Sequence, residues 1–440
     1  MTIKWTNWAG NVECQPSHYH EPTTEEALVA LVKQVASKGE RIKVVGAGHS
    51  CSKIAASDGV HLVSLQRYQQ VLEVNHDART VTVQAGIWLK ELNDFLATEG
   101  LALSNMGVIA EQSIAGAIST ATHGTGIRFG SLAQQVVALS LVTASGEVIS
   151  ASKEQNPDAF AAAQVSLGSL GILSTVTLLC EPAFNLHAIQ DVSDLDSTLE
   201  KLDSLLEAEH FGFWWIPHTD YVRLWSAKRT NQRASDSQNK AWAWFNDILL
   251  GSYLHESALW LSSFVPSLVP TVNRVFRALL FNRQQEQIGR CDHVFTLTIL
   301  MRQVIMEYGI PIEHTASALR ELRDLIKRHN FKVHLPVDVR FTNAEDAWLS
   351  PAWGRKTCYI GILMYRPFGR DVPYEACFRE VDALMSKFEG RPHWGKLHYR
   401  TASDLQQAYP HWDDFQKIRQ KLDPAGVFMN DYLERVFGSV

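Results

Sequence analysis

Basic residues are not in excess in this 440-residue sequence, which has 41 lysines and arginines, 47 aspartates and glutamates, and a net charge of −6. Binding to a phosphate backbone relies on a basic surface, so nucleic acid is not an expected partner. Glycine and proline are few, at 26 and 15 residues, which excludes a fibrous or largely disordered chain. Hydrophobic residues make up 46% of this globular composition, and at roughly 150 residues per domain the length suggests about three folding units.

Cysteine is too sparse and too scattered to indicate a disulfide framework or a zinc site. The cysteines form no CxxC pair and have no zinc-type spacing with histidine. A reduced, intracellular setting is the simplest interpretation, and no metal site is predicted. The positions are Cys14, Cys51, Cys180, Cys291, Cys358 and Cys377.

A leader and a spanning helix are also missing from the hydrophobic pattern. The N-terminus has no basic segment followed by an apolar one, so we expect no secretory signal. The most apolar stretch, residues 258–281, contains Pro266, Pro270, Arg274 and Arg277, which argues against a helix of about 20 apolar residues. Buried core or a surface-covering helix is favoured for this stretch, with a membrane-surface patch as the alternative. We therefore expect a cytoplasmic protein, with peripheral membrane contact as the second option.

Hydrophobic periodicity predicts an α+β chain. Helical spacing of apolar residues occurs over 24–38, 88–99, 157–167 and 315–328. Residues 231–240 are polar and turn-prone, and 241–290 is predicted to be mostly helical. Period-2 alternation and β-branched residues predict strands at 41–45, 61–65, 71–74, 80–85, 137–143, 148–150, 172–180, 331–341 and 357–364.

The first segment with chemical content is VVGAGHSCS, residues 44–52. Two glycines separated by one residue, Gly46 and Gly48, let backbone amides close on a phosphate. A dinucleotide fingerprint would need a third glycine where Cys51 stands, followed by a helix, so the Rossmann interpretation fails. The alternatives are a pyrophosphate cradle between strands, with His49 at its tip, and a plain tight turn.

A second segment, SIAGAISTATHGTG at residues 113–126, is dense in small residues. Such a backbone allows a flat ligand and its phosphates to approach closely. Taken alone it is also compatible with a structural turn, and a lone histidine in such a turn is more often a hydrogen-bonded structural residue than a reactive one.

A polar face is predicted on the strand at residues 333–341. Alternate residues of a strand point to opposite sides, so His334, Asp338 and Arg340 share one side while the apolar residues share the other. An aspartate and an arginine two residues apart on a strand, such as Asp338 and Arg340, usually form a surface ion pair worth about 0–1 kcal/mol. The alternative is that these two residues form a charged wall of a binding site.

These segments together resemble a known family. GAGHS followed by the IAGAISTATHGTG segment, TNWAGN at residues 6–11, PVDVRF at 336–341 and PHWGK at 392–396 are similar to aldonolactone and alditol oxidases of the vanillyl-alcohol oxidase (PCMH-type) fold. The resemblance covers nearly the whole chain and is strongest to the branch that acts on L-gulono-1,4-lactone. It implies an FAD-binding domain over residues 1–182, an antiparallel-sheet cap over 183–390 and a C-terminal segment, 391–440, that completes the active site.

The resemblance also implies how FAD is held. His49 would be bonded covalently to the flavin, and Ile172 would contact the adenine end. Lys396 would lie beside the N1 and C2 carbonyl edge of the flavin, where it stabilises negative charge. The remaining cofactor-binding residues implied by the family are Gly46, Ala47, Gly48, Ser50, Ser113, Gly116, Thr120, Thr122, His123 and Gly124.

By the same resemblance, Asp338 and Arg340 bind the sugar and take part in catalysis with Lys396. The relatives carry glutamate at the position of Asp338, so the carboxylate here is one methylene shorter, which requires a closer substrate or an intervening water. His393 either fixes its loop or faces the substrate.

The resemblance implies O2 as electron acceptor and H2O2 as product, because Gly107 stands at the position that controls oxygen access. A glycine that merely shapes a turn is the alternative. Val108, Gly361 and Leu363 replace the polar contacts of the polyol oxidases, which favours a lactone ring oxidised at C2 by hydride transfer to flavin N5. An alditol oxidase, a lactone dehydrogenase with another acceptor and a noncatalytic flavin protein stay open as alternatives, as does the oligomeric state.

Overall fold

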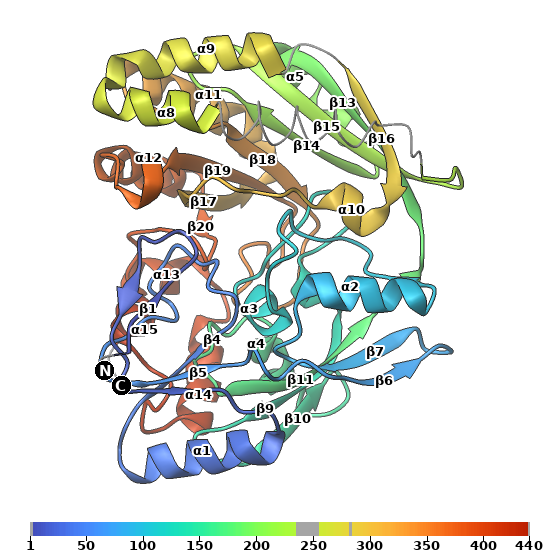
Figure 1. Ribbon diagram of the computed structural model, residues 1–440, viewed down its shortest axis with the longest axis vertical. Coiled ribbons are helices and arrows are strands. Elements are labelled where there is room, and N and C mark those ends of the chain that lie inside the picture. The colour runs from blue at the N-terminus through green and yellow to red at the C-terminus, as the bar shows by residue number, and fades with distance from the viewer. Residues whose placement is uncertain (1–2, 235–254, 281–283, 439–440) are drawn as a thin grey trace.

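The computed structural model describes residues 3–234, 255–280 and 284–438. Within these ranges the strands form two groups (Figure 1). A large antiparallel sheet occupies the upper half of the view, and smaller sheets from the first 182 residues occupy the lower half. This arrangement confirms the predicted α+β class.

The lower half contains a parallel sheet of order β3-β5-β4 and an antiparallel sheet of order β10-β9-β11-β7-β6. Helix α1 (Glu25–Ser37) forms where predicted, because Thr24 caps its first turn. The side of the helix that bears Leu28 and Val32 is buried against the sheet core. The parallel strands are β3 (His18–His20), β4 (Ile42–Val45) and β5 (His61–Ser64). The antiparallel strands are β6 (Val71–Asn75), β7 (Thr80–Gln84), β9 (Val136–Val142), β10 (Val148–Ser152) and β11 (Ile172–Leu179). The other helices here are α2 (Leu89–Thr98), α3 (Ile114–Ser119) and α4 (Pro157–Ala163).

The upper sheet has the order β16-β13-β15-β14-β18-β19-β17-β20, with every pair antiparallel. One face packs on helices α11 (Thr315–Arg328) and α12 (Glu375–Lys387). The opposite face bears the polar residues of the site. The strands are β13 (Asn185–Asp194), β14 (His210–Trp215), β15 (Tyr221–Thr230), β16 (Gln285–Arg290), β17 (Gln303–Pro311), β18 (Val337–Thr342), β19 (Thr357–Tyr365) and β20 (Arg391–Pro392).

The end of the chain returns to the lower half. Helices α13 (Ala402–Ala408), α14 (Trp412–Leu422) and α15 (Asp431–Phe437) contribute side chains to the same hydrophobic core as α2, α3 and α4. Between these helices and β20 lies the PHWGK motif, which therefore sits where the two halves meet (Figure 1).

Three expectations from the sequence need correction. The predicted strand at 331–341 begins only at Val337, because Pro336 has no N–H to donate to a ladder. Residues 285–290 form strand β16, not helix, since pairing with β13 overrides their local preference. The helix predicted to reach residue 167 ends at Ala163. Residues 231–234 are irregular, as expected for a loop, while residues 235–254 and 281–283 lie outside the described part of the chain.

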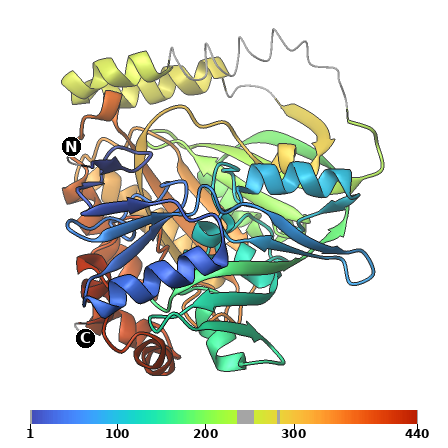
Figure 2. The same ribbon diagram turned by 60° about the horizontal axis from the view of Figure 1, so that its bottom comes forward.

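The apolar stretch at 258–281 forms helices α8 (His255–Phe264) and α9 (Val269–Leu280) at one edge of the molecule (Figure 2). Leu259 and Val269 are buried, whereas Leu261 and Phe264 are exposed. Among the helices that the structure describes, none combines the length and apolarity needed to cross a bilayer.

Candidate active site

The GAGHS segment is a turn braced by the start of the chain. The Asn7 side chain donates to Ser50 O at 2.9 Å, the Asn11 side chain donates to Cys51 O at 2.8 Å, and the backbone N–H of Trp8 donates to Gly48 O at 2.9 Å. The indole of Trp8 stacks on the His49 ring with centroids 5.1 Å apart. The TNWAGN motif thus holds the 46–50 turn in place through contacts that the preceding strand β4 does not provide.

Replacing Asn7 with alanine is expected to lower the unfolding free energy by about 1–3 kcal/mol, because Ser50 O and Val12 N–H would both lose a buried partner. The measurement is the melting temperature of the flavin-loaded protein. Asn185→Ala, which removes one exposed hydrogen bond to Gln232 O, is the control and should shift the melting temperature little. Equal shifts for the two variants would contradict the bracing role.

A cleft opens beside this turn. It is lined by backbone from three separate segments, around residues 46–50, 112–120 and 167–173. Gly46 is needed for the close approach of two of them, since a Cβ there would collide with the Ser113 hydroxyl, and Gly48 has a φ of +71°. Of the predicted cofactor-binding residues, the lining contains Gly46, Ala47, Gly48, His49, Ser50, Ser113, Gly116, Thr120 and Ile172.

His49 is a neutral imidazole with a free ring nitrogen. Its Nδ1 atom is buried and has no hydrogen-bond partner among the described residues. Burial and the nearby positive charge of Lys396 lower the pKa of His49 to about 4. A ring nitrogen without its proton offers a lone pair, which is what a bond to carbon requires.

Thr122, His123 and Gly124 lie outside the lining of this cleft and form a buried wall next to the large sheet. The Gly124 position is crowded by Asn105 and Met106, and a Cβ at Gly107 would lie 2.9 Å from the Thr122 methyl group. Residues 105–107 therefore pack directly against residues 122–124, and the predicted oxygen-access position borders the predicted cofactor wall.

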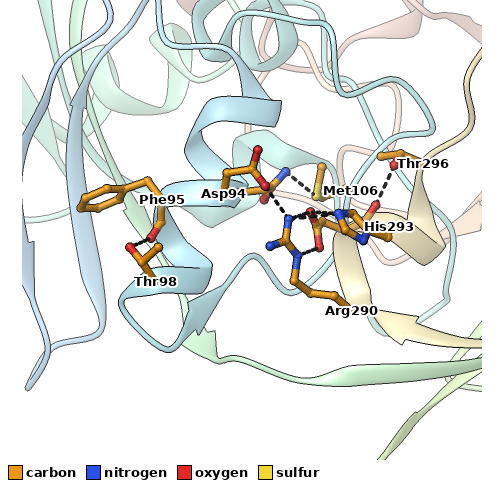
Figure 3. Close-up of polar contacts among 9 residues, drawn as sticks. Asp94, Phe95, Thr98, Met106, Arg290, His293 and Thr296 are labelled. Carbon is orange, nitrogen blue, oxygen red and sulfur yellow. Dashed lines mark hydrogen bonds and ion pairs between the residues drawn. The ribbon is translucent and has the colours of Figure 1, made fainter. Parts of the chain in front are cut away.

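The residue 105–107 segment is also tied to the large sheet through α2 (Figure 3). The Asn93 amide of α2 contacts Met106 Sδ at 3.2 Å, and Arg290 at the end of β16 donates to Asp94 at 2.6 Å. Arg290 also holds Asp292 at 2.6 Å. Its guanidinium bridges the two carboxylates and balances one of their two negative charges.

Asp338 and Arg340 come together as predicted. They share the polar face of β18, with Asp338 Oδ2 accepting from Arg340 Nη2 at 2.6 Å. His334 does not join them, because it precedes the strand. It is buried instead beside His218, and burial together with that neighbour lowers the pKa of His334 to about 4.

The same face continues across neighbouring strands. Directly paired residues of antiparallel strands point to one side, so Trp214, Asp338, Gly361 and Glu307 form one row. A Cβ built at Gly361 would find its nearest neighbours only 3.7 Å away, at Asp338 and Leu363. A side chain at this position would contact Asp338, so glycine leaves the side-chain position between the two carboxylates unfilled.

Glu307 and Tyr359 are site residues that the sequence reasoning missed. Glu307 Oε1 lies 3.1 Å from His123 Nε2, and the Tyr359 ring stacks on His123 with centroids 3.6 Å apart. The available signal was period-2 alternation in QVIMEYGIP, which places the only acid of β17 on the face opposite Met306 and Tyr308.

The PHWGK motif joins the cleft to this sheet. Cys51 N–H donates to Gly395 O at 2.8 Å, and His393 N–H donates to the backbone oxygen of Glu307 at 3.0 Å. His393 Nδ1 accepts from Gly395 N–H at 3.1 Å, so this ring fixes its own loop. Within the described residues the Lys396 ammonium has no hydrogen bond or ion pair, and its positive charge acts on both His49 and Glu307.

The profile of the D-arabinono-1,4-lactone oxidase family matches residues 176–436, more than half of the chain. The chain belongs to this family. A second profile, described as an FAD binding domain, matches residues 16–152. The lower half of this lactone oxidase family member is therefore an FAD-binding domain.

Relatives of known name agree with this membership. The chain is 41% identical to L-gulonolactone oxidase of Scyliorhinus torazame, over 99% of each chain. It is 39% identical to L-gulono-1,4-lactone dehydrogenase of Mycobacterium tuberculosis, over 100% of each chain. The crystal structure of cholesterol oxidase from B. sterolicum superposes with a TM-score of 0.80 at 15% identity and covers 99% of this chain and 97% of that one, which shows a shared fold.

The residues present in this family member fit FAD. The cleft offers closely approachable backbone from the 46–50 turn and the start of α3, as a pyrophosphate requires. Neither His49 Nδ1, at the cleft edge, nor the Lys396 ammonium has a hydrogen-bond partner among the described residues. His49 would supply the nucleophile for a bond to the flavin, and Lys396 would supply a fixed positive charge.

Proposed function

We propose that this member of the family oxidises the C2 hydroxyl of an aldono-1,4-lactone of the L-gulono type, with FAD as cofactor and O2 as final acceptor, giving H2O2. The observation that carries the proposal is the Asp338–Arg340 pair on the sheet face that also bears Glu307, with Lys396 nearby, whose charge acts on both Glu307 and His49. The 41% identity to a named gulonolactone oxidase over the full length supports the substrate class.

Each charged residue has a defined task in this proposal. FAD, when bound, supplies the acceptor for the hydride that leaves the substrate carbon. Arg340 donates to the substrate oxygen and stabilises its negative charge as the hydroxyl proton passes to solvent water. The ion pair engages Asp338 Oδ2, and the proposal assigns Oδ1 to a neighbouring substrate hydroxyl. Lys396 holds positive charge beside the ring edge that becomes electron-rich.

We further propose the division of the chain that the resemblance implies. Residues 1–182 bind FAD and residues 183–390 bind the lactone. Residues 391–440 bring Lys396 to the boundary and anchor it through helices packed in the first core. The hydrogen bonds from Cys51 N–H to Gly395 O and from His393 N–H to Glu307 O support this boundary position.

A ring-shaped substrate is supported by the composition of the polar face. Gly361 places no side chain beside Asp338, and Leu363 lies on the same side two residues further along β19. Val108 O accepts from Leu297 N–H at 2.8 Å, which places the cap segment after β16 against the residues that follow Gly107. A compact lactone with few exposed hydroxyls suits this lining better than an extended polyol.

A lactone dehydrogenase with a different acceptor is the second candidate, and the name of the mycobacterial relative favours it. Gly107, buried against Thr122, supports the oxidase alternative through the family resemblance. For location we propose the cytoplasm, with peripheral membrane contact through α8 and α9 as the alternative.

An anaerobic bleaching screen tests the proposal. L-gulono-, L-galactono- and D-arabinono-1,4-lactone are each mixed with the enzyme, and loss of the flavin absorption is followed; xylitol and sorbitol serve as polyol controls. We expect rapid bleaching by at least one lactone and much slower bleaching by the polyols. Bleaching by polyols alone would overturn the substrate class.

The acceptor is then tested in air. One H2O2 per lactone consumed is expected from an oxidase. Peroxide far below the lactone consumed, with fast turnover when an artificial quinone is added, would assign the dehydrogenase instead.

A further inference from the structure

Both ring nitrogens of His123 face hydrogen-bond acceptors. Nδ1 lies 3.0 Å from Gly124 O, and Nε2 lies 3.1 Å from Glu307 Oε1. A neutral imidazole has only one N–H, so one of these contacts would set a lone pair against an oxygen. An imidazolium donates to both. The hydrogen-bond geometry therefore assigns a positive charge to His123.

Glu307 is the carboxylate that balances this charge. Burial raises the pKa of Glu307, but the hydrogen bond and positive charge of His123, with that of Lys396, bring it well below its usual range. The other buried carboxyl near His123 is Glu345, which accepts from the Ser131 and Ser350 hydroxyls and whose pKa is raised by burial. Glu307 is thus the ionised partner.

The remaining groups that face this pair do not change the assignment. Burial lowers the pKa of His393 to about 3, and its Nδ1 accepts a backbone N–H, so this ring is neutral. Burial raises the pKa of Tyr359 well above its usual range, so its ring stacks on His123 as an uncharged phenol. Lys396 is the other cation near Glu307. Two cations and one anion leave the boundary with a net positive charge.

The pair lies on the row that carries the proposed substrate site. Glu307 and Asp338 are on one face of the sheet, on the strands either side of Gly361, which has no side chain. Arg340 is on the same face and pairs with Tyr359, whose ring stacks on His123 of the FAD-binding half.

We propose that Glu307 is a positioning residue for the lactone oxidation: it keeps His123 as an imidazolium, so that a further fixed cation, besides Lys396 and Arg340, stands beside the reacting groups. The inference rests on the proposed function for its catalytic consequence and on the His123 hydrogen bonds for the charge itself. A fixed cation stabilises the negative charge that develops during hydride transfer.

The charge on His123 is measured directly in the wild-type holoenzyme. Protein labelled with ¹⁵N-histidine, with His123→Asn to assign the signals, is expected to show a proton on both ring nitrogens of His123 at neutral pH, as two donated hydrogen bonds require. Signals of a neutral ring at neutral pH would overturn the proposal. This readout needs no substrate, so it stands even if no lactone bleaches the flavin.

The role of Glu307 is tested with Glu307→Gln, which keeps the shape and removes the charge. We expect lactone-driven flavin reduction to slow by at least about tenfold at about pH 8.5 and to recover to within about twofold at about pH 5.5, where an ordinary histidine is protonated. An equal loss at every pH, or no loss, would overturn the positioning role.

A matched control comes from the same sheet. Glu286→Gln breaks a second glutamate–histidine contact, 3.2 Å between Glu286 Oε2 and His187 Nε2, at the exposed β13–β16 edge. Its reduction rate should equal that of wild type at each pH. The metal content of both proteins is also measured. If the wild type binds one equivalent of divalent metal and Glu307→Gln binds none, then His123, Glu307 and His393 form a metal site instead of an ion pair, and the proposal is overturned.

Discussion

Flavin reduction by the lactone is expected to slow by at least about 100-fold when Arg340 is replaced by alanine, the loss typical of removing a donor aimed at developing negative charge. The Arg340 side chain is only 11% exposed and lies on the polar face of β18. Low exposure strengthens its interaction with a charged oxygen, because little water competes. The measurement is the single-turnover rate of flavin bleaching under anaerobic conditions.

The Arg340 variants separate charge from geometry. Arg340→Lys keeps the charge but loses the two-pronged guanidinium, so an intermediate rate is expected. Arg320→Ala, which removes a surface contact from Arg320 on α11 to Asp196, is the control and should reduce at the wild-type rate. An Arg340→Ala enzyme that reduces as fast as wild type would remove this residue from the site.

Loss of covalent flavin attachment is the expected result of His49→Ala. Wild-type protein should keep its yellow colour in the pellet after acid precipitation, and its mass should exceed that of the polypeptide by one FAD. The variant should release all of its flavin into the supernatant, since alanine has no ring nitrogen to form the bond. In wild type the pKa of His49 is lowered to about 4, so at neutral pH its ring is uncharged and one of its two nitrogens offers a lone pair.

His76→Ala is the matched histidine control. His76 is in the lower half too, but its ring is mostly exposed and pairs with Glu99 at 3.1 Å. Its flavin should stay in the pellet. If wild-type protein already releases its flavin with acid, FAD is held without a covalent bond and the His49 assignment fails.

Local chemistry made much of this molecule predictable. Small residues at 46–50 and 113–126 predict a phosphate-binding backbone, and the first segment and the 113–120 part of the second line one cleft. Alternation on β18 placed Asp338 and Arg340 on one side, and they form an ion pair. These features depend on neighbours close in sequence, where turn geometry and strand periodicity dominate.

What escaped prediction depends on contacts between distant segments. Glu307 is one acid in an apolar strand, and its importance comes from His123, 184 residues away. His334 fits the alternation but lies before the strand, because Pro336 cannot donate to the ladder. Strand β16 is polar and is held by pairing with β13. In each case the position of the residue or strand depends on a contact that the periodicity of its own segment does not reveal.

The last helices have a consequence for biosynthesis. Ile42 N–H donates to Val427 O, the buried Lys43 ammonium to Phe428 O, and the Asn430 amide to Lys53 O. These early residues depend on partners that are made almost 400 residues later, a connectivity that slows folding. A nascent chain without residues 427–430 lacks these hydrogen-bond partners, so maturation of the dinucleotide cleft, and with it prosthetic-group loading, is expected to follow the synthesis of these residues.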